Sequence, residues 1–365
     1  MKRPEKRANL DYVLLIVLVM LIGAGLVLLY STSAYNGQNK FQDAYYYVKK
    51  QGAATVLGVI GMLIVAKIDY HKWIPFANLG YLVSIILSVL VMLVGEEYNG
   101  SKRWLSLGPL SFQPSEFSKV AIILFLACLI SGQKKCVDNW HSMLRLMLPV
   151  LPVTALVGAS NLSTAIIILG IAVVLIFVAS PKYIQFIWMG ILGIGFMAIF
   201  LALESYRLER LAIWRNPEQY EKGYQTLQGL YAIGSGGLFG RGIGQSVQKL
   251  GFLPEAQNDM IFSIICEELG LFGAGMIIIL FLILIWRFFI IAINAKDLLG
   301  ALIVTGAMAH MMIQVILNIA VVTNTIPNTG ISLPFISYGG TSVLFLLAEM
   351  GLALSVAKGI KFEVN

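Results

Sequence analysis

Residues 11–31 read DYVLLIVLVMLIGAGLVLLYS, and after Asp11 this stretch has no charged side chain. About 20 consecutive apolar residues are needed for a helix to cross roughly 30 Å of hydrocarbon, so the stretch predicts a membrane-spanning helix. It is too long for the apolar core of a signal peptide, and no convincing A-x-A cleavage site follows it. We therefore expect a retained membrane anchor.

The composition of the whole chain extends this prediction. Of the 365 residues, 58% are hydrophobic and 12% are charged, and the mean hydropathy is +0.82. Soluble domains carry about 25% charged residues, so there is too little charge here to coat two or three soluble domains. The apolar runs do not alternate with polar residues as the strands of a β-barrel do. The sequence therefore predicts an all-α, polytopic membrane protein.

Apolar runs of similar length recur along the chain. They predict about ten transmembrane helices, at 11–31, 51–67, 76–95, 116–131, 145–159, 162–180, 185–203, 259–290, 298–322 and 341–357. Very little joins the fifth run to the sixth, and the eighth is too long for one perpendicular crossing, so part of it must tilt or lie at an interface. We expect a single integral membrane domain over residues 1–365.

The distribution of Lys and Arg predicts the orientation in the membrane. Ten spans place both termini on one side, and the short segments on that side hold most of the basic residues. The positive-inside rule then predicts cytoplasmic termini in a bacterial cytoplasmic membrane. In this topology a large extracytoplasmic loop, about 204–258, joins helices 7 and 8, and segments 96–115 and 323–340 also face outward.

The formal net charge of +7 suits contact with membrane lipid that is anionic, or with a substrate that carries phosphate. The positive-inside bias alone accounts for most of it. The charge is scattered between the spans, so nucleic acid is not an expected partner. The cysteines and histidines are also dispersed and lack the spacing of a metal site or a redox pair. They are Cys128, Cys136, Cys266, His71, His141 and His310.

Two charged residues lie at the start of the fourth predicted span. Pro114 suits the first turn of a helix, and Glu116 complements the positive end of the helix dipole, whereas Lys119 opposes it. Glu116 and Lys119 are three residues apart and so lie on one face. They are either a local ion pair that lets Lys119 snorkel to water or a charged pair that lines a polar cavity.

Asp259 lies where the large outward loop meets the eighth span. It is either a carboxylate that caps the start of the helix or a catalytic group. Upstream, the glycine-rich segment 234–244 would allow a ligand to approach the backbone, but it is not a Walker loop.

Further along the eighth span, Glu267 lies about 12 Å below Asp259 and roughly 80° around the helix, and Glu268 points nearly opposite. We expect one of these two carboxylates to tie helices together, and the same explanation suits Glu349 in the last span. The segment 334–340 predicts a rigid re-entrant turn.

Taken together, these segments resemble the SEDS family (shape, elongation, division and sporulation), and the FtsW and SpoVE branch more than the RodA branch. The resemblance covers nearly the whole chain and keeps the order of the motifs. The motifs are Arg103-Trp104, Gln113-Pro114-Ser115-Glu116 with Lys119, Gly223-Tyr224-Gln225, Leu253-Pro254-Glu255 with Asp259, Glu267-Glu268-Leu269-Gly270, and Leu333-Pro334-Phe335 with Ser337-Tyr338-Gly339-Gly340.

The resemblance implies a peptidoglycan glycosyltransferase that polymerises lipid II outside the cytoplasmic membrane. It also implies a class B penicillin-binding protein as the transpeptidase partner, together with other proteins of the division or elongation complex. The key aspartate of the family corresponds to Asp259, and its charged pair corresponds to Glu116 and Lys119. The chain departs from the family where Asn258-Asp259-Met260 replaces Thr-Asp-Phe, and where Ser160-Asn161-Leu162 replaces Pro-Asp-Leu.

The implied reaction is an inverting displacement, so a base must take the proton from the acceptor hydroxyl, and we expect Asp259 to be that base. Burial would raise the pKa of Asp259, and Lys119 nearby would lower it. Arg103, Lys119 or Arg241 would hold the pyrophosphate, with Mg²⁺ or Mn²⁺ as a possible helper.

We further expect Gln248 and Ser337 to contact the substrate, and an apolar groove between spans to hold the isoprenoid tails. Two other classes of function are compatible with the sequence: a flippase for lipid-linked sugars, and a non-catalytic scaffold of the division machinery.

Overall fold

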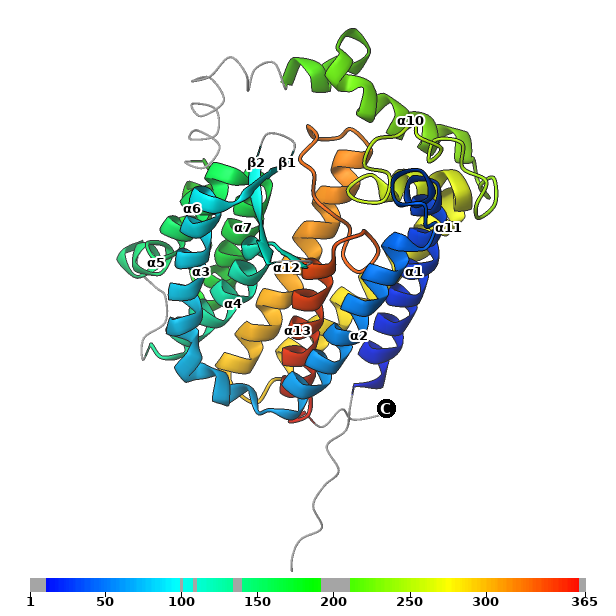
Figure 1. Cartoon of the computed structure of the whole chain (residues 1–365). Coiled ribbons are helices and arrows are strands. Elements are labelled where there is room, and N and C mark those ends of the chain that lie inside the picture. Colours follow the sequence, from blue (N-terminus) through cyan, green and yellow to red (C-terminus); the bar gives the residue numbers. More distant parts are fainter. Residues whose placement is uncertain (1–10, 99–100, 108–109, 134–139, 192–210, 361–365) are drawn as a thin grey trace, which may run out of the picture.

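The computed structural model describes residues 11–98, 101–107, 110–133, 140–191 and 211–360. These residues form a bundle of long helices with a small sheet at one end (Figure 1). The long helices are α1 (Tyr12–Phe41), α2 (Tyr46–Lys67), α3 (Ile74–Val94), α4 (Pro114–Ser131), α7 (Leu162–Ala179), α11 (Ile261–Ile293), α12 (Leu298–Val322) and α13 (Gly340–Ala357). The shorter ones are η1 (Tyr70–Trp73), α5 (Trp140–Met147), α6 (Val150–Ser160), η2 (Pro217–Gln219), η3 (Glu221–Gly223) and α10 (Tyr224–Gly236).

Eight of the described helices are long and apolar enough to cross a membrane, and the number is nine if α5 and α6 form one span. These two helices are bent by 46° at a short break after Met147, so the expected single run 145–159 is wrong in detail. The expected seventh span, 185–203, is helical over 184–191, and its remainder lies outside the described residues. The expected N-terminal segment, Cys136 and the start of the large loop lie outside them as well.

The surface and the interior of the bundle differ in the way expected of a membrane protein. Apolar side chains such as Leu57 on α2 and Leu93 on α3 are more than 60% exposed, whereas polar groups such as Thr32 and Asn318 are fully buried. Because lipid solvates apolar side chains and not polar ones, this pattern is favourable only in a bilayer. α12 lies at the centre and packs against α4, α7, α11 and α13.

The segment between α3 and α4, expected to be an outward loop, contains a three-stranded antiparallel sheet. Its strands are β1 (Glu96–Tyr98), β2 (Ser101–Leu107) and β3 (Leu110–Phe112), in the order β1-β2-β3. The all-α prediction therefore holds for the spans but missed this sheet, in which β1 and β3 have only three residues each and are too short to give an alternating pattern.

The long apolar run that begins near residue 259 is broken rather than straight. Gly270 has φ 68° and ψ −169°, so α11 consists of two helical pieces that meet at this residue. The second piece, 271–293, is long enough to span the hydrocarbon at about 1.5 Å per residue. The run is therefore not one straight helix, and the expectation that part of it tilts or lies at an interface stays a prediction.

The ends of the bundle are distinct. The start of α1 and the end of α13 lie at one end, while the sheet, α10 and the loop between α12 and α13 lie at the other (Figure 1). The candidate residues of the sequence motifs gather towards this second end, which we call the site end.

Candidate active site

Asp259 lies directly before α11, in a turn that is almost fully buried. Its residue is 9% exposed, and its Oδ1 atom has no hydrogen-bond partner among the residues that the structure describes. The N-cap of α11 is Met260, whose side chain makes no capping hydrogen bond. A buried carboxylate oxygen without a donor is costly, and a ligand that donates to Oδ1 would relieve this cost.

The surroundings of Asp259 change its proton affinity. Burial raises the pKa of Asp259 to about 7, and the negative charge of Glu255 adds to this rise. The backbone amides of Asp259 and Met260 and the positive charge of Arg103 act in the opposite direction. Sequence reasoning expected Lys119 to provide this positive charge. A carboxylate with a pKa near neutrality can take up and release a proton at physiological pH, as a general base must.

The backbone on either side of Asp259 is held by α12 and by the loop between α12 and α13. Asn318 Nδ2 donates to the carbonyl of Asp259 (2.8 Å) and to that of Ile331 (2.7 Å). The Ser337 hydroxyl donates to the carbonyl of Asn258 (2.6 Å) and accepts from the amide of Leu333 (2.7 Å). Ser337 is 3% exposed, so the structure places it under the Asp259 turn as a support.

The predicted charged pair at the start of α4 is formed, and it points into the bundle. Lys119 Nζ lies 2.8 Å from Glu116 Oε1 and 3.2 Å from Gln314 Oε1 of α12. Lys119 is only 1% exposed, so it does not snorkel to water. The snorkelling interpretation is therefore wrong, and the alternative, a charged pair that lines a polar cavity, stays a prediction.

A second buried pair continues from the first. His310 of α12 lies between the carboxylate of Glu349 on α13 (2.9 Å from Nδ1) and the side-chain oxygen of Gln314 (2.8 Å from Nε2). Glu349 therefore ties two helices together, as expected. Sequence reasoning missed His310, Gln314 and Asn318, although their spacing of four residues along an apolar helix places three polar groups on one face.

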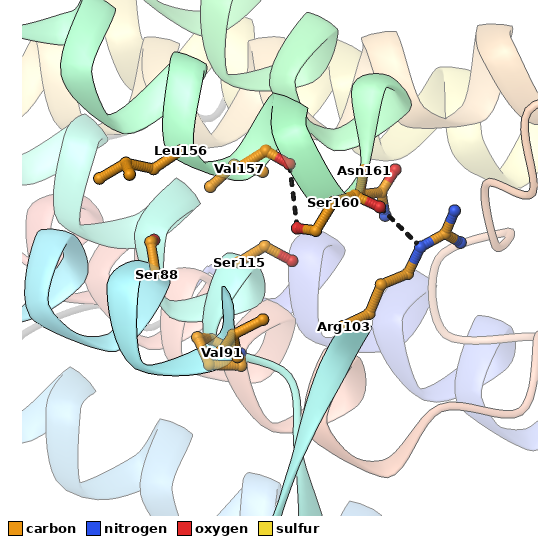
Figure 2. A pocket seen from close by; sticks show the side chains of 9 residues that line it. Ser88, Val91, Arg103, Ser115, Leu156, Val157, Ser160 and Asn161 are labelled. Atoms are coloured by element: carbon orange, nitrogen blue, oxygen red, sulfur yellow. Dashed lines mark hydrogen bonds between the residues drawn. The ribbon is translucent and has the colours of Figure 1, made fainter. Parts of the chain in front are cut away.

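Arg103 on β2 lines a small recess at the site end, with a cavity volume of about 10 Å³ (Figure 2). Its Nε atom donates to the carbonyl of Ser160 (3.1 Å), and the guanidinium group extends past Asn161. Asn161 ends α6 and caps α7 by accepting from the amide of Thr164 (3.2 Å). An amide oxygen serves as a helix cap as well as a carboxylate does, so the replacement of the family acid leaves this junction intact.

Arg241, Gln248 and the two neighbouring glutamates of α11 form a separate polar group. Glu267 accepts from the Ser246 hydroxyl (2.5 Å) and from the amide of Gln248 (3.4 Å), and Arg241 Nη1 lies 3.6 Å from it. Glu268 pairs with Lys249 Nζ (2.7 Å). Both glutamates therefore hold the large loop against α11. Arg241 and Gln248 belong to this contact, because both lie against Glu267.

The glycine-rich segment approaches α11 rather than an open site. A Cβ atom on Gly240, where φ is +77°, would lie 2.2 Å from the carbonyl oxygen of Glu268. One on Gly270 would lie 2.3 Å from the amide nitrogen of Gly240. The close approach that these glycines permit is therefore between the loop and the break in α11.

Comparison with known proteins places the chain in a family. The sequence model of the FtsW, RodA and SpoVE proteins, described as "Cell cycle protein", matches residues 12–361. The chain belongs to this family. It is 39% identical to stage V sporulation protein E of Bacillus subtilis, over 97% of this chain and 98% of that protein.

Other family members agree with this placement. The chain is 35% identical to the probable peptidoglycan glycosyltransferase FtsW of Trichlorobacter lovleyi, over 99% of this chain and 96% of that protein. These relatives confirm the predicted resemblance to the FtsW and SpoVE branch.

Two solved structures of the family share the fold. One is a chain from work described as structural coordination of polymerization and crosslinking by a peptidoglycan synthase complex, with a TM-score of 0.81 and 26% identity over 96% of this chain and 98% of that chain. The other is the rod shape determining protein RodA of Thermus thermophilus, with a TM-score of 0.72 and 26% identity over 97% and 99% of the two chains. The predicted multi-pass helical membrane fold is confirmed.

Proposed function

We propose that this family member is a peptidoglycan glycosyltransferase that polymerises lipid II, with Asp259 as the general base. The observation that carries the proposal is the buried Asp259 carboxylate, whose pKa is about 7 and whose backbone is clamped by α12 and the loop that follows it. The names of the FtsW relatives support the reaction class.

In the proposed reaction, the hydroxyl oxygen of the acceptor sugar attacks the anomeric carbon of the donor. The bond between that carbon and the pyrophosphate oxygen breaks, and the lipid pyrophosphate leaves with the bonding electrons. Asp259 takes the proton of the acceptor hydroxyl as the new bond forms, which is a contribution of about 10² to 10⁴ in rate.

Arg103 is our first choice for the group that faces the pyrophosphate. It lines the pocket of Figure 2, and its charge acts on Asp259, so both ends of the displacement would lie within its field.

A divalent ion remains part of the proposal as a helper. Glu255, whose charge acts on Asp259, is a carboxylate of the kind that Mg²⁺ or Mn²⁺ prefers as a ligand, and Asp259 keeps its role as the base. No group of three or more His, Cys, Asp and Glu side chains with the geometry of a metal site occurs in the described residues, so substrate oxygens and water would complete the shell. When bound, the ion would neutralise the charge of the pyrophosphate.

We also propose a class B penicillin-binding protein as the partner, with further proteins of the division or elongation complex. Support comes from the similar chain in a peptidoglycan synthase complex that coordinates polymerization and crosslinking. The proposed location is the bacterial cytoplasmic membrane, with the site end outside and both termini in the cytoplasm, consistent with the positive-inside rule.

The test is polymerisation of fluorescent lipid II by the purified protein together with its cognate class B penicillin-binding protein. We expect glycan strands from the wild type and a loss of at least about 100-fold in the Asp259→Asn variant. Asp43→Asn is the matched control, because Asp43 is a half-buried acidic residue in the turn between α1 and α2, where it pairs with Lys49.

The alternatives predict other outcomes. A flippase would translocate the wild-type substrate across vesicles without forming polymer. A scaffold would support growth of cells in which Asp259→Asn and Lys119→Met are both present. Full polymerisation by Asp259→Asn would show that another residue is the base.

A further inference from the structure

Three polar residues of α12 form a row that connects the buried charged pair to the base. His310, Gln314 and Asn318 are spaced four residues apart, so they lie on one face of the helix. Each is 2% exposed or less. Gln314 contacts Lys119 and Asn318 holds the carbonyl of Asp259, so one helix face touches both parts of the candidate site.

The hydrogen-bond chemistry of Lys119 determines how Gln314 is oriented. A lysine ammonium only donates, so the atom of Gln314 that faces Lys119 Nζ at 3.2 Å must be the side-chain oxygen. The amide nitrogen of Gln314 then donates to the carbonyl of Ser332 (3.0 Å). In the reverse orientation the NH₂ group would face the ammonium, and the Ser332 carbonyl would lose its donor.

The orientation of Gln314 in turn determines the protonation of His310. Its Nε2 atom lies 2.8 Å from the same Gln314 oxygen, so Nε2 must carry a hydrogen. Its Nδ1 atom lies 2.9 Å from both carboxylate oxygens of Glu349, and a proton must lie between these two groups. Whichever of the two holds it, the pair of His310 and Glu349 is neutral overall and keeps the hydrogen on Nε2.

We propose that His310 and Glu349 are positioning residues for the glycosyltransferase site. Their shared proton keeps the hydrogen on Nε2, which donates to the Gln314 oxygen. That oxygen therefore stays facing Lys119, and the NH₂ group of Gln314 keeps donating to the carbonyl of Ser332 in the loop segment 331–332. This segment and Asp259 share the Asn318 side chain, so a displacement of Gln314 is transmitted to the base. The inference rests on the proposed function and adds two residues that contact no substrate.

The variants that test it change Glu349 in two ways. In Glu349→Gln the new NH₂ group donates to Nδ1 of a neutral His310, so Nε2–H is preserved, and we expect polymerisation to stay within about threefold of wild type. In Glu349→Met the acceptor is lost, and we expect kcat to fall by about 10- to 100-fold with little change in KM, as expected for a misplaced catalytic group. Equal losses in the two variants would overturn the proposal.

A double variant separates positioning from general damage. If Glu349 acts through Gln314, Glu349→Met should add less than about twofold to the loss caused by Gln314→Met alone. Losses that multiply would show that Glu349 acts by another route. The melting temperature of each variant, measured in the same detergent, identifies any variant that fails to fold.

A second readout does not depend on activity. In protein labelled with ¹⁵N-histidine, NMR should show a protonated Nε2 for His310 in both the wild type and Glu349→Gln, with His310→Gln used to assign the signal. An unprotonated Nε2 in the wild type would overturn the proposal. A wild type with protonated Nε2 that never polymerises lipid II would instead refute the proposed function and leave the hydrogen-bond arrangement standing.

Discussion

At the scale of single residues, the Asp259 carboxylate is buried and its Oδ1 atom has no hydrogen-bond partner among the described residues. The effect of this burial on its pKa makes the rate of polymerisation depend on pH. Because the pKa of Asp259 is raised to about 7, the base is protonated in acid and deprotonated in alkali. We expect kcat to rise about tenfold per pH unit below pH 7 and to level off above it, as initial rates from pH 5.5 to 8.5 would show. A midpoint below pH 5 would mean that Asp259 is not the titrating base.

The same shift affects stability. The folded pKa of about 7 lies above the ordinary value of 3.8, so between these values the folded state binds more protons than the unfolded state. Stability is therefore lost as the pH rises through this window, by up to about 4 kcal/mol. We expect Asp259→Asn to melt several degrees above the wild type at pH 8 and at the same temperature at pH 4. A variant that is less stable than wild type at pH 8 would contradict this.

Sequence reasoning found the charged members of the site, because Asp259, Glu116 and Lys119 are conspicuous in apolar surroundings. It missed Gln314 and Asn318, because a neutral amide is less costly than a charge in an apolar helix, and only the four-residue spacing of the two indicates a common role. The role of Ser337 was beyond reach for another reason. Its partner Asn258 is 79 residues away in the chain, and only the folded loop brings the two together.

At the scale of elements, the break in α11 depends on the loop that precedes it. The amides of Leu271 and Phe272 donate to the carbonyls of Gly237 (2.9 Å) and Leu238 (3.0 Å), so the loop caps the second helical piece. The sequence showed that the run was too long, but the position of the break depends on these partners and could not be read from apolar periodicity. Unsatisfied amides at this depth would be costly in lipid.

This packing predicts unequal effects of two glycine substitutions. We expect Gly240→Ala to lower the melting temperature strongly, by the equivalent of at least about 2 kcal/mol, because the new Cβ would overlap the carbonyl of Glu268 at a positive φ. Gly234→Ala in α10 is the control, because apart from its neighbours in the helix no atom of the described residues lies within 4 Å of its Cβ position. Similar melting temperatures for the two variants would contradict the proposed close approach.

The contact of the large loop with α1 depends on a buried ion pair. Glu268 binds both Lys249 Nζ (2.7 Å) and the hydroxyl of Ser31 (2.7 Å), so it joins α11, the loop and α1. We expect Glu268→Gln to destabilise the protein by about 3–5 kcal/mol, since it leaves Lys249 buried without its charge partner. Adding Lys249→Met should restore part of this loss, as thermal unfolding of the single and double variants would show. No recovery would mean that the pair is not coupled.

At the scale of the whole molecule, the composition was enough to predict a helical bundle that spans the membrane, because each span carries its own apolar run. The small sheet between α3 and α4 was not predicted, since β1 and β3 have three residues each and their pairing is a tertiary event. The structure also shows that the first turn of α1 and the last turn of α13 lie together at the end of the bundle opposite the sheet (Figure 1).

The orientation of these ends in the membrane gives the last prediction. Position 49 is exposed in the first turn of α2, position 218 in η2 and position 72 in η1. The start of α2 and the segment that holds η2 lie at the site end, and the connection between α2 and α3 that holds η1 lies at the opposite end (Figure 1). We expect Lys49→Cys and Glu218→Cys, in a chain whose three native cysteines are replaced, to react with an impermeant maleimide on intact cells. Lys72→Cys should react only after permeabilisation, because the basic short segments keep that end inside. The reverse pattern would place Asp259 on the cytoplasmic side, where a polymerase of exported lipid-linked sugar has no substrate.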